Sequence, residues 1–154
     1  MGLMLAGLLV HEGRRVTVAD PHPERRAQAA ELGARAVEAL DRCDLVFEAV
    51  GRPSAWCDAV AAAAPGAVVV LVGGCPKGSE TALPTGPVHY DELELRGSFH
   101  HAPAEVDRAL ELLAEGAFDW RVLAGPTIGL DDLPDVLARR ADGRAVKWVV
   151  DPRG

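Results

Sequence analysis

Short apolar runs alternate along this chain with longer stretches that mix apolar and polar residues. A short continuous apolar run is typical of a strand that is buried on both faces, and the longer stretches have the spacing of helices. We predict strands at residues 16–20, 44–50, 67–72, 93–99 and 145–150, and helices at 2–12, 24–32, 54–64, 104–115 and 130–140. This alternation predicts an α/β fold, in which helices cover both faces of a doubly wound parallel sheet.

Glycine and proline residues mark the ends of these predicted elements. Gly13 and Gly33 follow the first two helices, where a glycine with a positive φ commonly ends a helix. Residues 76–87 are rich in proline and glycine and are expected to form a loop. Residues 2–12 are apolar nearly all round, so we expect this first helix to be buried against the sheet.

The composition indicates a globular protein whose partner is a small molecule. The 154 residues are 49% apolar, and the net charge of −7 argues against a nucleic-acid groove or an anionic membrane surface. Cys43, Cys57 and Cys75 are too far apart for a Cys-x-x-Cys zinc pair, and a reducing, cytoplasmic setting fits them best. Residues 1–10 lack the basic region of a signal peptide and are too short to span a membrane.

Four positions at predicted strand ends are candidates for ligand contact, because ligands of doubly wound sheets bind outside the carboxyl ends of the strands. Asp20 can accept hydrogen bonds from both hydroxyls of an adenosine ribose and repel a 2′-phosphate, or it can merely begin a turn. Gly51, Gly73 and Gly97 allow a close approach of the backbone to a flat ligand or to phosphates, although glycine is also common in ordinary turns.

Sequence motifs surround these positions. Residues 1–4, Met-Gly-Leu-Met, resemble the end of the Gly-x-Gly-Pro-x-Gly-Leu-Met stretch of zinc-type medium-chain alcohol dehydrogenases, which makes Gly2 the third glycine. Residues 20–26 are similar to that family's Asp-x-x-x-x-Arg turn, in which the acid holds the adenosine ribose and the arginine, here Arg25, packs beside the adenine. Further stretches that resemble the family in register are residues 31–34, 44–51, 69–73, 94–99 and 143–147.

The resemblance implies a Rossmann-type nucleotide-binding half that lacks its first strand and is preceded, in the full-length parent, by a catalytic domain that holds zinc. It divides the chain into a truncated dinucleotide-binding domain at 1–101 and a C-terminal helix-strand extension at 102–154. The cofactor is expected to be NAD rather than NADP, with Lys147 reaching the pyrophosphate and Gly73 and Gly97 beside the nicotinamide. The residue types at the predicted strand ends and the family resemblance together give the expected cofactor-binding residues: Gly2, Asp20, Arg25, Gly51, Gly73, Gly97 and Lys147.

The expected activity of the parent is a zinc-assisted transfer of hydride between a secondary alcohol and NAD. Residues 89–93 and 97–101 resemble the polyol and threonine dehydrogenase branch, which suggests a polyol substrate, and the parent is expected to be a cytoplasmic homo-oligomer without nucleic-acid or membrane partners. We find no convincing catalytic residue or metal ligand in the chain, so it is expected to be inactive alone. Two alternatives remain open: a non-catalytic nucleotide-binding module, and a small doubly wound enzyme of another family such as a methyltransferase.

The remaining polar and aromatic candidates are expected to have structural or surface roles. His100 and His101 point to opposite faces if they extend a strand, and no carboxylate or cysteine is spaced to complete a metal site with them. The other histidines are expected to be solvated and without partners, and the tryptophans to fill space in the core or between domains. The fourth residue after Tyr90 is Glu94 rather than a lysine, so the Tyr-x-x-x-Lys pair of short-chain dehydrogenases is absent. The histidines expected to be solvated are His11, His22 and His89, and the tryptophans expected to fill space are Trp56, Trp120 and Trp148.

Overall fold

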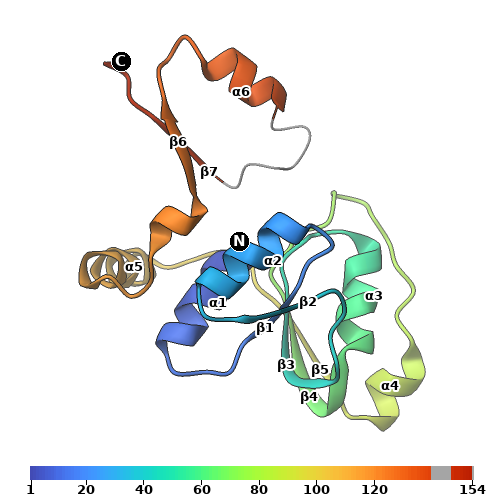
Figure 1. The fold of residues 1–154 in the computed structure, drawn as a ribbon. Coiled ribbons are helices and arrows are strands. Elements are labelled where there is room, and N and C mark those ends of the chain that lie inside the picture. The colour runs from blue at the N-terminus through green and yellow to red at the C-terminus, as the bar shows by residue number, and fades with distance from the viewer. Residues whose placement is uncertain (140–146, 154) are drawn as a thin grey trace. The chain divides into compact units, whose positions relative to one another are not determined.

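The computed structural model describes residues 1–139 and 147–153, and it has the alternating order of helices and strands expected of an α/β fold (Figure 1). The helices are α1 (Gly2–His11), α2 (Pro23–Glu31), α3 (Pro53–Ala61), α4 (Thr85–Tyr90), α5 (Pro103–Glu115), α6 (Leu133–Arg139) and the short 3-10 helix η1 (Trp120–Leu123). The strands are β1 (Thr17–Ala19), β2 (Arg35–Val37), β3 (Cys43–Glu48), β4 (Ala63–Leu71), β5 (Glu94–Gly97), β6 (Ala124–Ile128) and β7 (Lys147–Val150).

The strands of the described residues form three small sheets. Strands β3, β4 and β5 form a parallel sheet in which Val46 pairs with Val69 and Val69 pairs with Leu95. Strands β1 and β2 form a second sheet, and β6 pairs with β7 in parallel. Helix α1 precedes β1 and α2 follows it, which is the order of helix, strand and helix that the sequence pattern predicts for this part of the chain.

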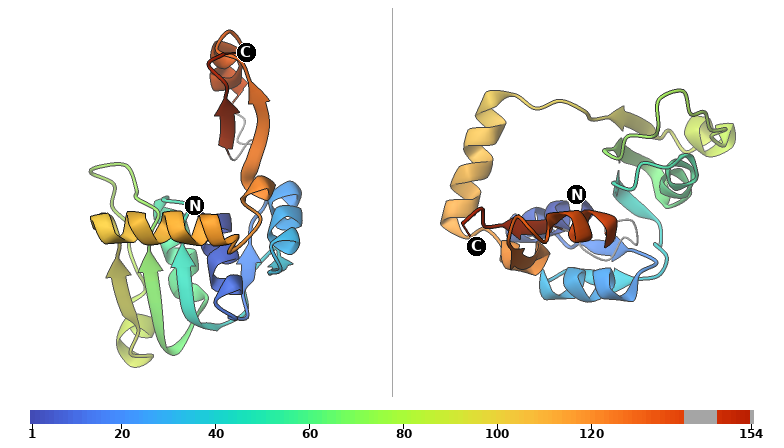
Figure 2. Two further views of the ribbon diagram at one scale, coloured as in Figure 1. Left: turned by 90° about the vertical axis from the view of Figure 1, so that its left-hand side faces the viewer. Right: turned by 90° about the horizontal axis from the view of Figure 1, so that it is seen from above.

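The chain divides into two compact units, each with its own apolar core. Unit 1 comprises Met1–Gly2 and Val37–Glu111, and unit 2 comprises Leu3–Ala36 and Leu112–Gly154. In unit 1, Ala59 of α3 packs on the sheet against Val46 and Val69, and Figure 2 shows the three strands of this sheet side by side. The core cluster of unit 2 joins α1, α2 and η1 and consists of Leu3, Ala6, Ala29, Leu32, Ala34 and Leu123. The domain boundary expected at residues 101 and 102 stays a prediction.

Several predicted elements are present close to where the pattern placed them, and the end of one predicted helix is wrong. Gly13 and Gly33 have φ of 73° and 88° and follow α1 and α2, as expected. Helix α1 buries Leu3, Ala6 and Gly7, while Met4 is 44% exposed. The predicted helix at 54–64 is too long, because Ala63 pairs with β3 as the first residue of β4. Residues 145–146 of the last predicted strand lie outside the described residues.

Four short elements were not predicted. Helix α4 overlaps the end of the segment expected to be a loop, and β2, β6 and η1 fall in stretches for which the sequence pattern predicts no helix or strand. Each of them is short, so the sequence offers no full period of apolar positions from which to recognise it.

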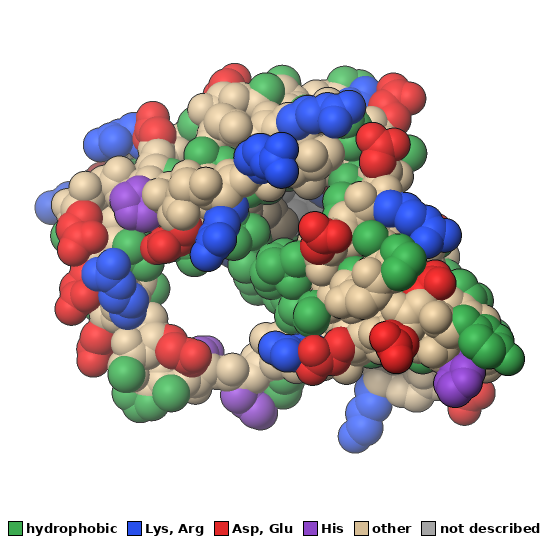
Figure 3. All heavy atoms as spheres, turned by 90° about the horizontal axis from the view of Figure 1, so that it is seen from below, with side chains coloured by type: hydrophobic (Ala, Val, Ile, Leu, Met, Phe, Trp, Pro, Cys, Tyr) green, Lys and Arg blue, Asp and Glu red, His purple; other side chains and the backbone are tan. Residues whose placement is uncertain are grey.

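Figure 3 shows one face of the molecule, which carries side chains of both charges. On the face drawn in Figure 3, acidic and basic side chains are interspersed, and neither sign forms a continuous patch there. Across residues 1–139 and 147–153, no helix combines the length and the apolar content that crossing a membrane requires.

Candidate cofactor-binding site

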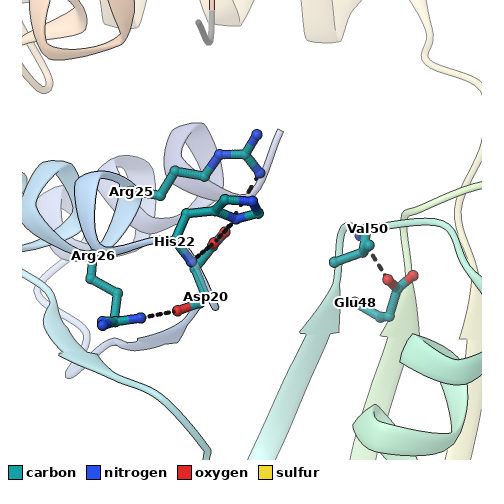
Figure 4. Close-up of polar contacts among 6 residues, drawn as sticks. All are labelled: Asp20, His22, Arg25, Arg26, Glu48 and Val50. Atoms are coloured by element: carbon teal, nitrogen blue, oxygen red, sulfur yellow. Dashed lines mark hydrogen bonds and ion pairs between the residues drawn. The ribbon is translucent and has the colours of Figure 1, made fainter. Parts of the chain in front are cut away.

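Asp20 lies in unit 2, in the turn between β1 and α2, and its carboxylate is held by neighbours from the same turn (Figure 4). The backbone N–H of His22 donates to Asp20 Oδ1 over 2.9 Å, and His22 Nδ1 lies 2.8 Å from the same oxygen. Arg25 Nη1 is 3.7 Å from Asp20 Oδ2, and Arg26 Nη1 donates to the Asp20 carbonyl over 2.7 Å. The expectation that His22 has no partner is therefore wrong.

This arrangement leaves the carboxylate suited to a sugar hydroxyl. The Asp20 side chain is 21% exposed, so it is accessible but fixed in direction. An ionised carboxylate has about four lone-pair sites, and the contacts with His22 and Arg25 occupy only part of that capacity. The remaining acceptor positions can bind a pair of vicinal hydroxyls such as those of a ribose.

Glu48 ends β3 in unit 1 and ties two strand-end turns together (Figure 4). Its Oε1 accepts hydrogen bonds from the backbone N–H groups of Val50 and Gly51, over 2.7 and 2.9 Å. Its carbonyl oxygen accepts hydrogen bonds from the N–H groups of Val72 and Gly73, each over 2.9 Å. Glu48 is 4% exposed, and its Oε2 has no hydrogen-bond partner among the described residues. A single buried residue thus fixes the turn after β3 and the backbone after β4.

Gly51 and Gly73 are required where these two turns meet. Gly51 has a φ of 77°, and a Cβ added there would lie 2.6 Å from the carbonyl oxygen of Gly74. A Cβ at Gly73 would overlap the backbone nitrogen of Gly51 and lie 2.6 Å from Glu48 Oε2. The Gly73 carbonyl also accepts a hydrogen bond from Trp56 Nε1 over 3.2 Å. The two turns therefore approach each other through their backbones, which only glycine permits.

Gly2 and Gly97 are less constrained by their surroundings. A Cβ at Gly2, the first residue of α1, would meet the Ala49 Cβ at an ordinary contact distance of 3.6 Å. Gly97 ends β5, and no atom lies within 4 Å of a Cβ built there. Both positions are compatible with a ligand, but the protein itself does not require glycine at either of them.

The predicted site residues are divided between the two units. Lys147 is the exposed first residue of β7, and residues 143–146 of its motif lie outside the described residues. The site residues in unit 1 are Gly2, Gly51, Gly73 and Gly97, and those in unit 2 are Asp20, Arg25 and Lys147. The structure thus describes one part of the predicted site around Asp20 and another around Glu48.

The residues present do not fit a zinc site. Within residues 1–139 and 147–153, no three His, Cys, Asp or Glu side chains are close enough together to hold a metal ion. The Cys57 Sγ lies 3.2 Å from Thr81 Oγ1, and the Cys43 Sγ contacts the carbonyl of Asp41 over 3.3 Å. These described thiols therefore have partners other than a shared metal.

Comparison with known proteins identifies the family. A family model described as zinc-binding dehydrogenase matches residues 1–115. The chain belongs to this family. A curated relative from Rhizobium meliloti (strain 1021), "Putative D-xylulose reductase", is 33% identical over 108 residues, which cover 66% of the chain and 28% of the relative.

Solved structures agree with this assignment. A "putative zinc-binding dehydrogenase" from Sinorhizobium meliloti 1021, bound to NADP, matches with a TM-score of 0.89 and 28% identity, over 98% of the chain and 49% of that protein. A protein from E. coli CFT073 named "short chain alcohol dehydrogenase (rspB)", complexed with NADH, shares the fold with a TM-score of 0.83 and 21% identity, over 97% of the chain and 48% of that protein. The chain thus has the Rossmann-like fold of nucleotide-binding dehydrogenase domains and spans about half the length of these proteins.

Sequence reasoning missed two residues that shape the site. Glu48 was treated as part of a strand, although it is a lone carboxylate within an apolar run, and that isolation is a signal that it has a buried partner. Trp56 is predicted to fill space in the core or between domains, but its indole N–H also donates a hydrogen bond to the carbonyl of Gly73. No residue type in the sequence reveals that contact, because the acceptor is a backbone atom.

Proposed function

We propose that this chain is the NAD-binding half of a zinc-dependent alcohol or polyol dehydrogenase. The observation that carries the proposal is the fixed, partly exposed carboxylate of Asp20 between β1 and α2, at the carboxyl end of a strand. Support comes from the family, from a relative named for D-xylulose reduction, and from similar structures that hold NADH or NADP. When bound, the nicotinamide ring would accept hydride from a secondary alcohol or return it to the carbonyl.

In this proposal each part of the chain binds one part of the cofactor. Asp20 accepts hydrogen bonds from the adenosine ribose, and the guanidinium of Arg25 lies against the adenine. The turns at Gly51 and Gly73, together with the end of β5 at Gly97, receive the nicotinamide and its ribose. Gly2 at the start of α1 and the ammonium of Lys147 contact the pyrophosphate, since a helix N-terminus and a lysine both favour anions.

We propose that NAD is preferred over NADP. A 2′-phosphate would place negative charge beside the Asp20 carboxylate, which repels it. The arginines are the opposing feature, because a nearby arginine can accommodate that phosphate. Arg25 and Arg26 both point back to Asp20, one to its carboxylate and the other to its carbonyl. Their engagement with Asp20 supports the preference for NAD.

The zinc and the catalytic groups are assigned to a part of the parent outside these residues. Among the described residues, no three His, Cys, Asp or Glu side chains cluster closely enough to hold a metal ion. The chain's own role is to bind and orient the cofactor. We also propose that the parent acts on a secondary alcohol or polyol, is cytoplasmic and is a homo-oligomer.

The test is an NMR titration of the 15N-labelled chain with the two halves of the cofactor. 5′-AMP at millimolar concentration is expected to shift amide signals around Asp20 and Arg25, and nicotinamide mononucleotide those around Gly51 and Gly73. The variant Asp20→Ala is expected to lose the response to 5′-AMP but keep the response to nicotinamide mononucleotide. A matched control is Asp44→Ala, which removes an exposed carboxylate outside the predicted site.

Other outcomes would favour the rival functions. Shifts with S-adenosylmethionine and none with either half of NAD would favour a methyltransferase. Binding of 5′-AMP alone, with no response to nicotinamide mononucleotide, would favour a nucleotide-binding module without a redox role.

A further inference from the structure

The carboxylate of Glu48 is the most unusual buried group among the described residues of unit 1. It is 4% exposed, and its Oε2 is buried without a hydrogen-bond partner in the described part of the chain. Burying a carboxylate with an unsatisfied oxygen is unfavourable for folding, and an apolar residue at the end of a strand would avoid that cost. The presence of such a costly group at a strand end favours a role in function over a role in stability.

The contacts of Glu48 show what that role is. Oε1 receives two converging backbone N–H groups, those of Val50 and Gly51, and thereby fixes the backbone path where β3 leads into α3. The carbonyl of the same residue binds the N–H of Gly73 at the end of β4. The side chain therefore sets one turn and the main chain sets the other.

The two turns are also locked against each other. Gly73 leaves space for Glu48 Oε2, which would lie 2.6 Å from a Cβ at that position, and Gly51 is packed against the backbone of Gly74. Trp56 of α3 also donates a hydrogen bond from its indole N–H to the Gly73 carbonyl, which links the helix to the turn after β4. Loss of the acceptor oxygen at Oε1 is therefore expected to release the backbone at Gly51, and through this packing to affect Gly73.

We infer that Glu48 is a positioning residue for the nicotinamide half of the site: its carboxylate oxygen holds the turn after β3 against the end of β4. The inference rests on the proposed function, because it assigns the nicotinamide mononucleotide portion of the cofactor to these turns. Glu48 itself does not touch the ligand, since its carboxylate is buried behind Gly73. What matters is an acceptor oxygen at the Oε1 position, with or without a negative charge.

The test compares two substitutions in the 154-residue chain. Glu48→Gln keeps an oxygen that can accept both N–H groups, whereas Glu48→Leu removes it. Nicotinamide mononucleotide and 5′-AMP are titrated separately and followed by NMR. Glu48→Leu is expected to weaken binding of nicotinamide mononucleotide about tenfold, the equivalent of roughly two lost hydrogen bonds, and to leave 5′-AMP binding unchanged. Glu48→Gln is expected to stay within about twofold of the original chain, because its amide oxygen replaces Oε1.

Hydrogen exchange of the amides provides a second readout without ligand. The amides of Val50 and Gly51 are expected to exchange faster in Glu48→Leu than in Glu48→Gln, because only the leucine variant leaves them without an acceptor. Glu80→Leu and Glu80→Gln are matched controls on an exposed loop carboxylate and are expected to change neither readout.

The possible results separate this inference from the proposed function. If the unmodified chain binds nicotinamide mononucleotide and Glu48→Leu binds it equally well, Glu48 is not a positioning residue although the site stands. If Glu48→Gln loses as much affinity as Glu48→Leu, the charge rather than the acceptor matters and the inference is wrong. If the unmodified chain does not respond to nicotinamide mononucleotide at all, the proposed function fails and this inference fails with it.

Discussion

His22 and Asp20 are joined through a single carboxylate oxygen, which receives the backbone N–H of His22 over 2.9 Å and lies 2.8 Å from His22 Nδ1. These two contacts fix the orientation of the Asp20 carboxylate, because the backbone of the turn and the His22 imidazole both hold the same oxygen. Whatever binds beside β1 therefore meets an acidic group of fixed orientation.

The first prediction concerns discrimination against a 2′-phosphate. The chain is expected to bind 5′-AMP more tightly than adenosine 2′,5′-bisphosphate, and Asp20→Ser is expected to reduce or reverse that difference. Removing one unfavourable charge contact changes the ratio of the two dissociation constants by about tenfold for each 1.4 kcal/mol. NMR titration with both nucleotides measures the ratio. Tighter binding of the bisphosphate by the unmodified chain would mean that Asp20 serves only the turn.

The second prediction concerns the glycines at the meeting turns. Gly73→Ala is expected to lower the free energy of unfolding by about 1–3 kcal/mol, because its Cβ would overlap the Gly51 backbone. Gly51→Ala is expected to have a similar effect, since it combines a φ of 77° with a close approach to the Gly74 carbonyl. Urea denaturation followed by circular dichroism measures both changes.

The control for these variants is Gly97→Ala. No atom lies within 4 Å of a Cβ at Gly97, so its substitution is expected to change the free energy of unfolding by less than about 0.5 kcal/mol. Equal stability of Gly73→Ala and Gly97→Ala would show that the two turns do not pack as described.

Much of the fold could be predicted because it depends on local patterns. The apolar runs at β3 and β4 and the glycines at 13 and 33 specify strands and helix ends within a few residues. The start of β4 could not be predicted, because alanine favours helices and residues 62–64 continue the run of α3. There the backbone of Ala62 accepts a hydrogen bond from the N–H of Cys43, a partner that is distant in sequence.

The candidate site was predictable only in part. Asp20 stands out because it is an acidic residue directly after an apolar run. The role of Glu48 depends on backbone N–H groups, which every residue except proline carries, so the identities of Val50 and Gly51 do not reveal it. Likewise, His22 is an ordinary turn residue by sequence and becomes informative only when its imidazole is seen beside Asp20.

The third prediction concerns Glu94 and Arg96, an exposed pair on β5. Arg96 donates two hydrogen bonds to the Glu94 carboxylate, over 2.7 and 2.9 Å, and these lower the pKa of Glu94 and raise the pKa of Arg96. A carboxyl whose pKa is lower in the folded chain adds stability above its unfolded pKa, and that stability is lost as the pH falls through the folded pKa. Arg96→Gln is therefore expected to return the Glu94 pKa to its usual range and to reduce stability at neutral pH but not in strong acid.

A 13C NMR titration of the glutamate carboxyls measures the pKa of Glu94 directly. Arg42→Gln serves as the control, because Arg42 pairs with Asp91, at 3.6 Å, rather than with Glu94. An unchanged Glu94 pKa in Arg96→Gln would show that the pair does not form in solution.

The last prediction is that the 154-residue chain, expressed alone, binds no stoichiometric zinc and oxidises no alcohol. A catalytic zinc needs about three protein ligands that converge on one ion, with one open position. Cys43 begins β3, Cys57 lies within α3 with its thiol beside Thr81, and Cys75 follows the turn after β4. Without a zinc ion to polarise the alcohol, the developing alkoxide has no Lewis acid. Elemental analysis of the purified chain, beside an assay of NAD reduction over a panel of polyols, tests this. One zinc per chain with measurable turnover would overturn the assignment of binding and catalysis to different parts of the parent.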